Sequence, residues 1–186
     1  MSNAHTPSKS ALDLRQEFDS TFQALPPVAP VARETLLAVR VGGQPYAIKL
    51  AETAGLVTGR QIVTVPSALP ELRGVAGIKG ALVPVYSLAA CLGHEDGDAR
   101  WLVLHRSDEA LAFAFTEFEG VLEVAGVELL APIRDPSASG PEGGQGASSH
   151  IRHVLPASAG LRSVLSLESV ARTIKERVGA LQPPKE

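Results

Sequence analysis

The chain has 186 residues, of which 45% are apolar and 20% are charged, and its formal net charge is −3. This is the composition of an ordinary globular protein, and the charge excludes a global attraction to nucleic acid or to an anionic membrane. The single cysteine excludes an internal disulfide, and no stretch approaches the roughly 18 apolar residues of a membrane-spanning helix, so we expect a cytoplasmic protein without membrane insertion.

Residues 1–35 differ in composition from the rest and are expected to form an N-terminal arm. Four apolar residues recur at spacings of four, four and three, which places them on one face of a helix: Leu14, Phe18, Phe22 and Leu25. Ser10 is available as the N-cap, and the prolines at 26, 27 and 30 predict a tether after the helix. The apolar face either folds back onto the domain or docks on a partner, and both readings stay open.

From Leu36 onward, short β-rich segments alternate with turn residues. Strands are expected at 36–41 and 46–50, and again at 101–106 and 111–115, each pair joined by a turn. The stretch RGVAGIKGALVPVYSL, residues 73–88, predicts a strand that carries Lys79, a tight turn at Gly80 and Ala81, and a second strand. Residues 167–181 share an apolar face at helical spacing and predict a C-terminal helix.

The β-rich region also resembles itself. Residues 36–57 align with 101–122 at an offset of 65, whereas residues 72–88 align with 151–167 at an offset of 79. The extra residues between the two registers match the segment SASGPEGGQGASS at 137–149, whose composition predicts a flexible insert. We therefore expect one domain over 36–181, built from half-repeats at about 36–92 and 100–170.

No phosphate-binding or hydrolytic motif is present. A P-loop places its lysine directly after the last glycine, whereas Lys79 precedes Gly80. No Gly-x-Ser-x-Gly occurs, and Ser87 and Ser166 are better explained as caps of the helices expected after them.

The remaining candidates for chemistry are also weak. His150 and His153 would lie on opposite faces of a strand, and no cysteine accompanies them, so no metal site is expected. Cys91 lies among apolar residues and is expected to be a small buried side chain. Three carboxylates alternate along a strand-like run, which favours a solvated face over an acid/base pair: Glu117, Glu119 and Glu123. We expect no enzyme, no cofactor and no metal.

Three segments resemble the CheW-like family of bacterial chemotaxis adaptors: LLAVRVGGQPYAIKL at 36–50, the proline step at 66–70 and GVAGIKGALVPVYSL at 74–88. The resemblance covers about residues 36–178. It implies an all-β fold of two intertwined five-stranded SH3-like β-barrels related by a pseudo-repeat, here with a C-terminal helix and the N-terminal amphipathic arm. It also implies a non-catalytic adaptor whose partners are the regulatory domain of a histidine kinase and the cytoplasmic tips of methyl-accepting chemoreceptors.

The chain departs from the family pattern where partners are contacted. The family's Asn, Arg and Asp of the central motif are replaced by Gly77, Lys79 and Ser87, and its acidic residue falls on Gly55. Lysine keeps the charge of arginine but loses the planar fork. The resemblance implies partner contacts at five residues: Thr53, Gly55, Gly74, Lys79 and Gly80. The alternative is a divergent scaffold that recruits or competes for array components through its N-terminal helix.

Overall fold

A computed structural model describes residues 32–131, 147–157 and 160–181. The expected arm helix and most of the insert at 137–149 lie outside these residues. The described elements follow in chain order: β1 (Arg33–Val41), β2 (Gln44–Lys49), η1 (Leu50–Glu52), β3 (Thr53–Thr58), β4 (Ile62–Val63), β5 (Leu72–Ile78), β6 (Ala81–Ser87), α2 (Leu88–Cys91), β7 (Trp101–His105), β8 (Ala112–Phe115), β9 (Glu117–Ala125), η2 (Gly126–Glu128), η4 (Ala147–Ser149), β10 (Ile151–Ala157), β11 (Gly160–Leu165) and α3 (Leu167–Leu181).

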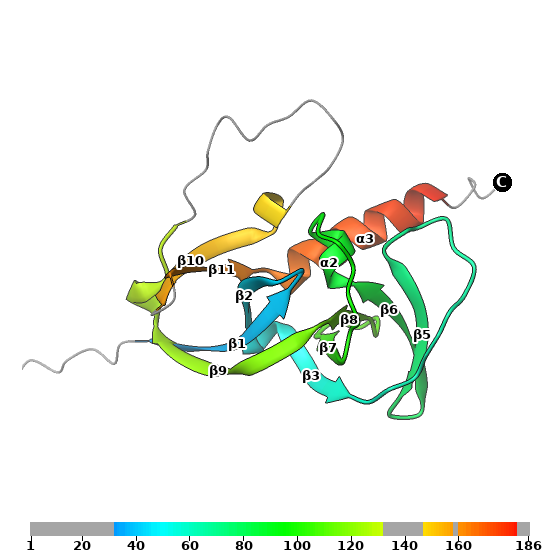
Figure 1. Ribbon diagram of the computed structural model, residues 1–186, viewed down its shortest axis with the longest axis horizontal. Coiled ribbons are helices and arrows are strands. Elements are labelled where there is room, and N and C mark those ends of the chain that lie inside the picture. The colour runs from blue at the N-terminus through cyan, green and yellow to red at the C-terminus, as the bar shows by residue number, and fades with distance from the viewer. Residues whose placement is uncertain (1–31, 132–146, 158–159, 182–186) are drawn as a thin grey trace, which may run out of the picture. The chain divides into compact units, whose positions relative to one another are not determined.

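The strands form two sheets, so the expectation of a mostly β fold is confirmed (Figure 1). The first has the order β10-β11-β2-β1-β9 and the second β3-β7-β8-β6-β5-β4. Parallel pairs join β2 to β11 and β6 to β8, so each sheet combines strands from early and late in the chain. The closed five-stranded barrels of the expectation are not found in the described residues, where the sheets have five and six strands and open strand orders.

The two sheets have matching pairings at the offsets found in the sequence. Val85 pairs with Ala112 in one sheet, and Val164 pairs with Ala47 in the other. The β-bulges correspond as well. The register skips Ala54 in β3 and Glu119 in β9, and it skips Arg73 in β5 and Arg152 in β10. A bulge inserts one residue and bends its strand, so the two sheets bend at equivalent points.

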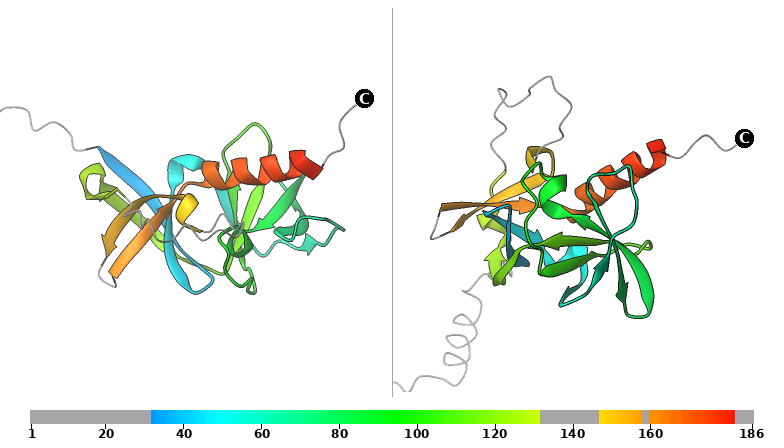
Figure 2. Two further views of the ribbon diagram at one scale, coloured as in Figure 1. Left: turned by 90° about the horizontal axis from the view of Figure 1, so that it is seen from above. Right: turned by 45° about the vertical axis from the view of Figure 1, so that its right-hand side comes forward.

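The main apolar cluster lies where the two sheets and the helices meet. It joins β1 and β2 to β7 and β8, and α3, whose course Figure 2 shows, adds four buried residues to the same cluster: Leu167, Val170, Ala171 and Ile174. There are two smaller apolar clusters in the described residues, one on the second sheet and one on the first. Burying these side chains is the principal source of stability, because each fully buried aliphatic side chain contributes about 1.5–3 kcal/mol.

Both helices begin at the serines expected to cap them. The Ser87 Oγ accepts the N–H of Ala90 at 3.1 Å, and the Ser166 Oγ accepts the N–H of Ser169 at 3.2 Å. The predicted bounds of the C-terminal helix, residues 167–181, are confirmed. Ala147–Ser149, the last three residues of the segment predicted as an insert, form a 3-10 turn whose first N–H donates to the Leu92 carbonyl at 3.2 Å.

Candidate interaction surface

The β5–β6 hairpin presents Lys79 and Gly80 at its tip. Ile78 pairs with Ala81, so these two residues form the whole turn, with φ of 51° and 82°. A two-residue turn with positive φ at both positions has the twist that antiparallel strands need. The turn expected from the sequence, formed by Gly80 and Ala81, would not have this twist. Lys79 therefore lies in the turn rather than on the strand, which corrects the expected position, and its side chain is exposed.

Thr53 and Gly55 lie on β3, at one end of the strand order of the second sheet. Thr53 is 3% exposed, and its Oγ1 donates to the Leu50 carbonyl at 2.9 Å, so its hydroxyl is used inside the fold. Gly55 follows the bulge at Ala54. A Cβ built on Gly55 would meet nothing closer than Leu104 at 3.9 Å, but φ is +157°, a backbone conformation that residues with a side chain rarely adopt.

Gly74 is buried beneath β4 rather than displayed to a partner. A Cβ at this position would lie 2.1 Å from the Val63 carbonyl oxygen, and φ is +143°. Only glycine allows the β4 backbone to approach so closely. The structure therefore gives Gly74 a packing role. No exposed surface at Gly74 supports the prediction that it contacts a partner.

The five residues implied by the resemblance thus fall in three places of the second sheet. Lys79 and Gly80 share the hairpin tip, Thr53 and Gly55 share an edge strand, and Gly74 is internal. The partner roles of these residues stay predictions. An exposed apolar residue that was not predicted lies three positions after Lys79: Leu82, near the start of β6, is 78% exposed. Its equivalent at the offset of 79 is Leu161, which is 65% exposed. Alternation with the buried Val83 was the signal that could have found it.

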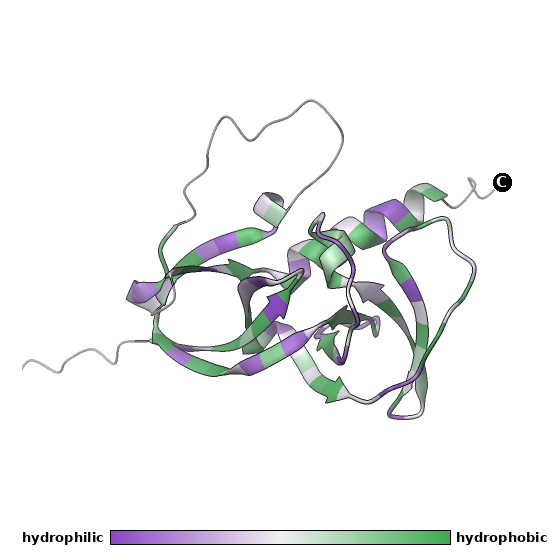
Figure 3. Ribbon diagram, in the orientation of Figure 1, coloured by the Kyte–Doolittle hydropathy of each residue, from purple (hydrophilic) through white to green (hydrophobic). Residues whose placement is uncertain are grey.

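Glu119 belongs to a charge cluster on the exposed face of the first sheet. Its carboxylate accepts hydrogen bonds from Arg162 on β11 and, at 2.7 Å, from Arg40 on β1. Its side chain is 22% exposed, against 63% for Glu117 and 69% for Glu123. The hydrogen bond from Arg162 is the main reason that the pKa of Glu119 lies below its ordinary value. Glu119 is nevertheless an exposed residue of β9, as Glu117 and Glu123 are, so it forms its ion pairs on the solvated face that the alternation predicts. Alternation along β9 is still visible in Figure 3.

Two buried histidines join strands to α3. His150 is buried before β10, and its Nδ1 lies 3.1 Å from the Ser169 Oγ. Burial lowers the pKa of His150, which keeps the ring neutral. In β7, the His105 Nε2 lies 3.0 Å from Glu168. His150 and Ser169 are both buried, so this pair is placed to fix β10 against α3 and not to meet a substrate.

The described residues contain no group of three or more His, Cys, Asp or Glu side chains that could hold a metal ion. Cys91 is mostly buried, and burial raises its pKa to about 12, so its thiol is not an activated nucleophile. Within the same residues, no helix is both long and apolar enough to cross a membrane.

Comparison with known proteins agrees with the fold and the motifs. The family model of the CheW-like domain matches residues 35–148. Among solved structures, the crystal structure of the scaffolding protein TtCheW from Thermoanaerobacter tengcongensis is similar, with a TM-score of 0.62 and 9% sequence identity. The match covers 73% of this chain and 90% of that one, and at this identity it shows a shared fold. No curated protein matches the sequence.

Proposed function

Because the chain belongs to the CheW-like domain family, we propose that it is a non-catalytic adaptor that couples methyl-accepting chemoreceptors to a chemotaxis-type histidine kinase. The match of the family model over residues 35–148 is the observation that carries the proposal. The adaptor would act in the cytoplasm, at the receptor tips of a chemosensory array.

The hairpin tip of the second sheet supports a binding role. The hairpin exposes a cation, Lys79, in its two-residue turn and an apolar side chain, Leu82, on β6 three residues later. Mixed apolar and charged contacts of this kind are typical of protein interfaces. The tip would bind its partner with modest affinity, and the many copies in an array would make the assembly stable.

A pull-down of the full chain with a kinase regulatory domain and with a receptor-tip fragment tests the proposal. Binding to both fragments is expected of a coupling adaptor. Binding to neither would overturn the proposal. Binding that requires only residues 1–32 would instead support the divergent scaffold, whose contact is the N-terminal arm.

Lys79→Glu tests the hairpin tip itself. The substitution reverses the charge in the turn and is expected to weaken binding to at least one fragment by about tenfold, or about 1.4 kcal/mol. Lys175→Glu makes the same charge change on α3, where it removes only a surface ion pair with Glu109, and serves as the matched control. Affinities measured by isothermal titration that are equal for Lys79→Glu and the control would remove Lys79 from the interface.

A further inference from the structure

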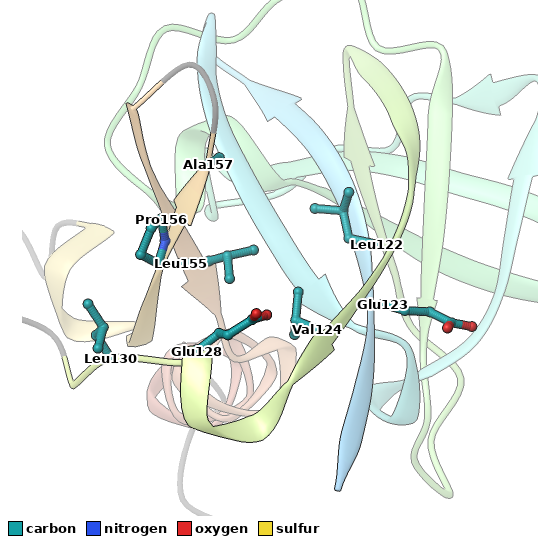
Figure 4. A pocket seen from close by; sticks show the side chains of 8 residues that line it. All are labelled: Leu122, Glu123, Val124, Glu128, Leu130, Leu155, Pro156 and Ala157. Atoms are coloured by element: carbon teal, nitrogen blue, oxygen red, sulfur yellow. The ribbon is translucent and has the colours of Figure 1, made fainter. Parts of the chain in front are cut away.

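An apolar groove of about 450 Å³ opens on the first sheet between the strands β9 and β10 (Figure 4). These are the two end strands in the order of that sheet. Six of its lining side chains are apolar and two are carboxylates: Leu122, Glu123, Val124, Glu128, Leu130, Leu155, Pro156 and Ala157.

The groove exists because a short strand of the second sheet has almost no counterpart in the first. In the second sheet, β4 pairs with β5 through Ile62 with Ala76 and Val63 with Val75. At the offset of 79, Val75 corresponds to Val154, which forms a single bridge with Leu130. The chain just before Leu130 turns away as η2 instead of continuing along β10. Leu155 therefore lacks the strand neighbour that Ala76 has.

β9 is an end strand of its sheet, so one of its backbone edges has no strand partner within the described residues. At the end of β9 the Ala125 N–H, at the N-cap of η2, donates to the Glu128 Oε2 at 3.1 Å. Alternate residues of a strand present their backbone groups to the same edge, so Glu123 offers the next N–H and C=O. The described residues contain no strand that pairs with β9 on this side.

The opposite wall limits how a ligand can bind. Pro156 has no N–H, and proline is confined to strand edges, so β10 can offer a carbonyl but no complete ladder at this position. A ligand in the groove must take most of its main-chain hydrogen bonds from β9. In Figure 4 the Glu128 carboxylate points into the groove, whereas Glu123 points away from it.

From this geometry we propose that the groove binds an extended apolar peptide segment of a partner protein, which adds as a strand to the free edge of β9. Its apolar side chains cover Leu122, Val124 and Leu155, and a basic side chain meets Glu128. Strand addition of this type draws its affinity from main-chain hydrogen bonds and its specificity from the pockets for alternate side chains. The proposal is independent of the kinase and receptor contacts proposed above.

A peptide with a sequence from this chain can be used to test binding in the groove. The hexapeptide Arg60–Val65, RQIVTV, contains the two apolar residues of β4 and a basic side chain, so it has the chemistry proposed for the ligand of the groove. A fluorescein-labelled form, titrated with the full chain, is expected to show saturable anisotropy with a Kd below about 1 mM. The same peptide with Ile62→Pro should not bind, because proline removes a ladder hydrogen bond. The peptide with Arg60→Glu should bind more weakly.

Two matched variants of the protein locate the site. Leu130→Asp places a charge in the groove and is expected to weaken the peptide about tenfold or more. Leu161→Asp makes the same change at an exposed position of β11 outside the groove lining and should leave affinity unchanged. Leu130 is 50% exposed, so its variant is expected to fold, which circular dichroism checks. Hydrogen exchange with the peptide bound should show added protection at Glu123 in β9.

The outcomes separate the proposal from its rivals. No saturable binding of the peptide, or equal binding to Leu130→Asp and wild type, would overturn it. Added protection on β5 instead of β9 would mean that the peptide replaces β4, which also overturns it. Self-association in sedimentation velocity that Leu130→Asp abolishes, without peptide binding, would assign the groove to a second copy of the chain. Since neither kinase nor receptor is present, failure here leaves the adaptor proposal untouched.

Discussion

Gly74→Ala isolates the close approach of β4 to β5. The new Cβ would lie 2.1 Å from the Val63 carbonyl oxygen, so β4 must move, and φ of +143° is strained for any residue with a side chain. Backbone strain costs about 1–3 kcal/mol and overpacking about 1–3 kcal/mol. We expect a loss of about 2–5 kcal/mol in the free energy of unfolding. In a domain of this size that is a fall in Tm of about 5–20 °C.

Gly77→Ala is the matched control, because it makes the same change in the same strand. A Cβ at Gly77 would meet no atom within 4 Å, and Gly77 is not among the residues with positive φ. Its free energy of unfolding should change by less than about 1 kcal/mol, in the stabilising direction if at all. Urea and thermal unfolding followed by circular dichroism measure both variants. Equal stability of the two variants would refute the packing role of Gly74, and lost partner binding at full stability would return it to the interface.

Three further predictions rest on single side chains. Arg162 lowers the pKa of Glu119 in the folded protein, so the wild type should be more stable than Glu119→Gln above the ordinary pKa of 4.5. This advantage should be lost as the pH falls through the pKa of Glu119 in the folded state. Urea unfolding at about pH 7 and about pH 3 compares the two proteins, and a difference that does not change with pH would contradict the assignment. With a pKa of about 12, the Cys91 thiol should be alkylated by iodoacetamide at about pH 8 only as the protein unfolds in urea, and rapid native alkylation would show that it is exposed. Ser87→Ala removes two hydrogen bonds of the buried Ser87 Oγ, one accepted from the Ala90 N–H and one donated at 2.8 Å to the Asp96 Oδ1, and should cost about 1–3 kcal/mol; calorimetry showing no loss would deny the cap.

Local patterns in the sequence were enough to predict most elements. Alternation predicted the strand at β5, where Ala76 and Ile78 are buried, and helical spacing gave the bounds of α3. Ser87 and Ser166 were recognised as caps because each ends a predicted strand before an expected helix. These features depend on neighbours within a few residues, which is the range that periodicity describes.

Contacts between distant residues could not be predicted in this way. Glu119 lies in an alternating run that predicts a solvated face, yet it binds Arg162, 43 residues later, and Arg40, 79 residues earlier. The position of Lys79 was missed because alternation continues through it, and only the pairing of Ile78 with Ala81 shows that the strand has ended. The groove forms because the chain turns at η2. The repeat in the sequence predicts a segment that corresponds to β4 at this place, but it does not predict the turn.

The pairing of β2 with β11, which are far apart in the sequence, has a consequence for the synthesis and folding of the protein. The Arg162 guanidinium on β11 donates at 3.0 Å to the Tyr46 carbonyl on β2, 116 residues earlier, and the paired residues of these parallel strands, such as Ser163 and Tyr46, are 117 residues apart. Closing so long a loop is slow and costs entropy before any contact is gained. The first sheet therefore cannot be completed until β11 has left the ribosome. A nascent or truncated chain would display unpaired strand edges, and a cell that makes this protein must protect or remove such fragments.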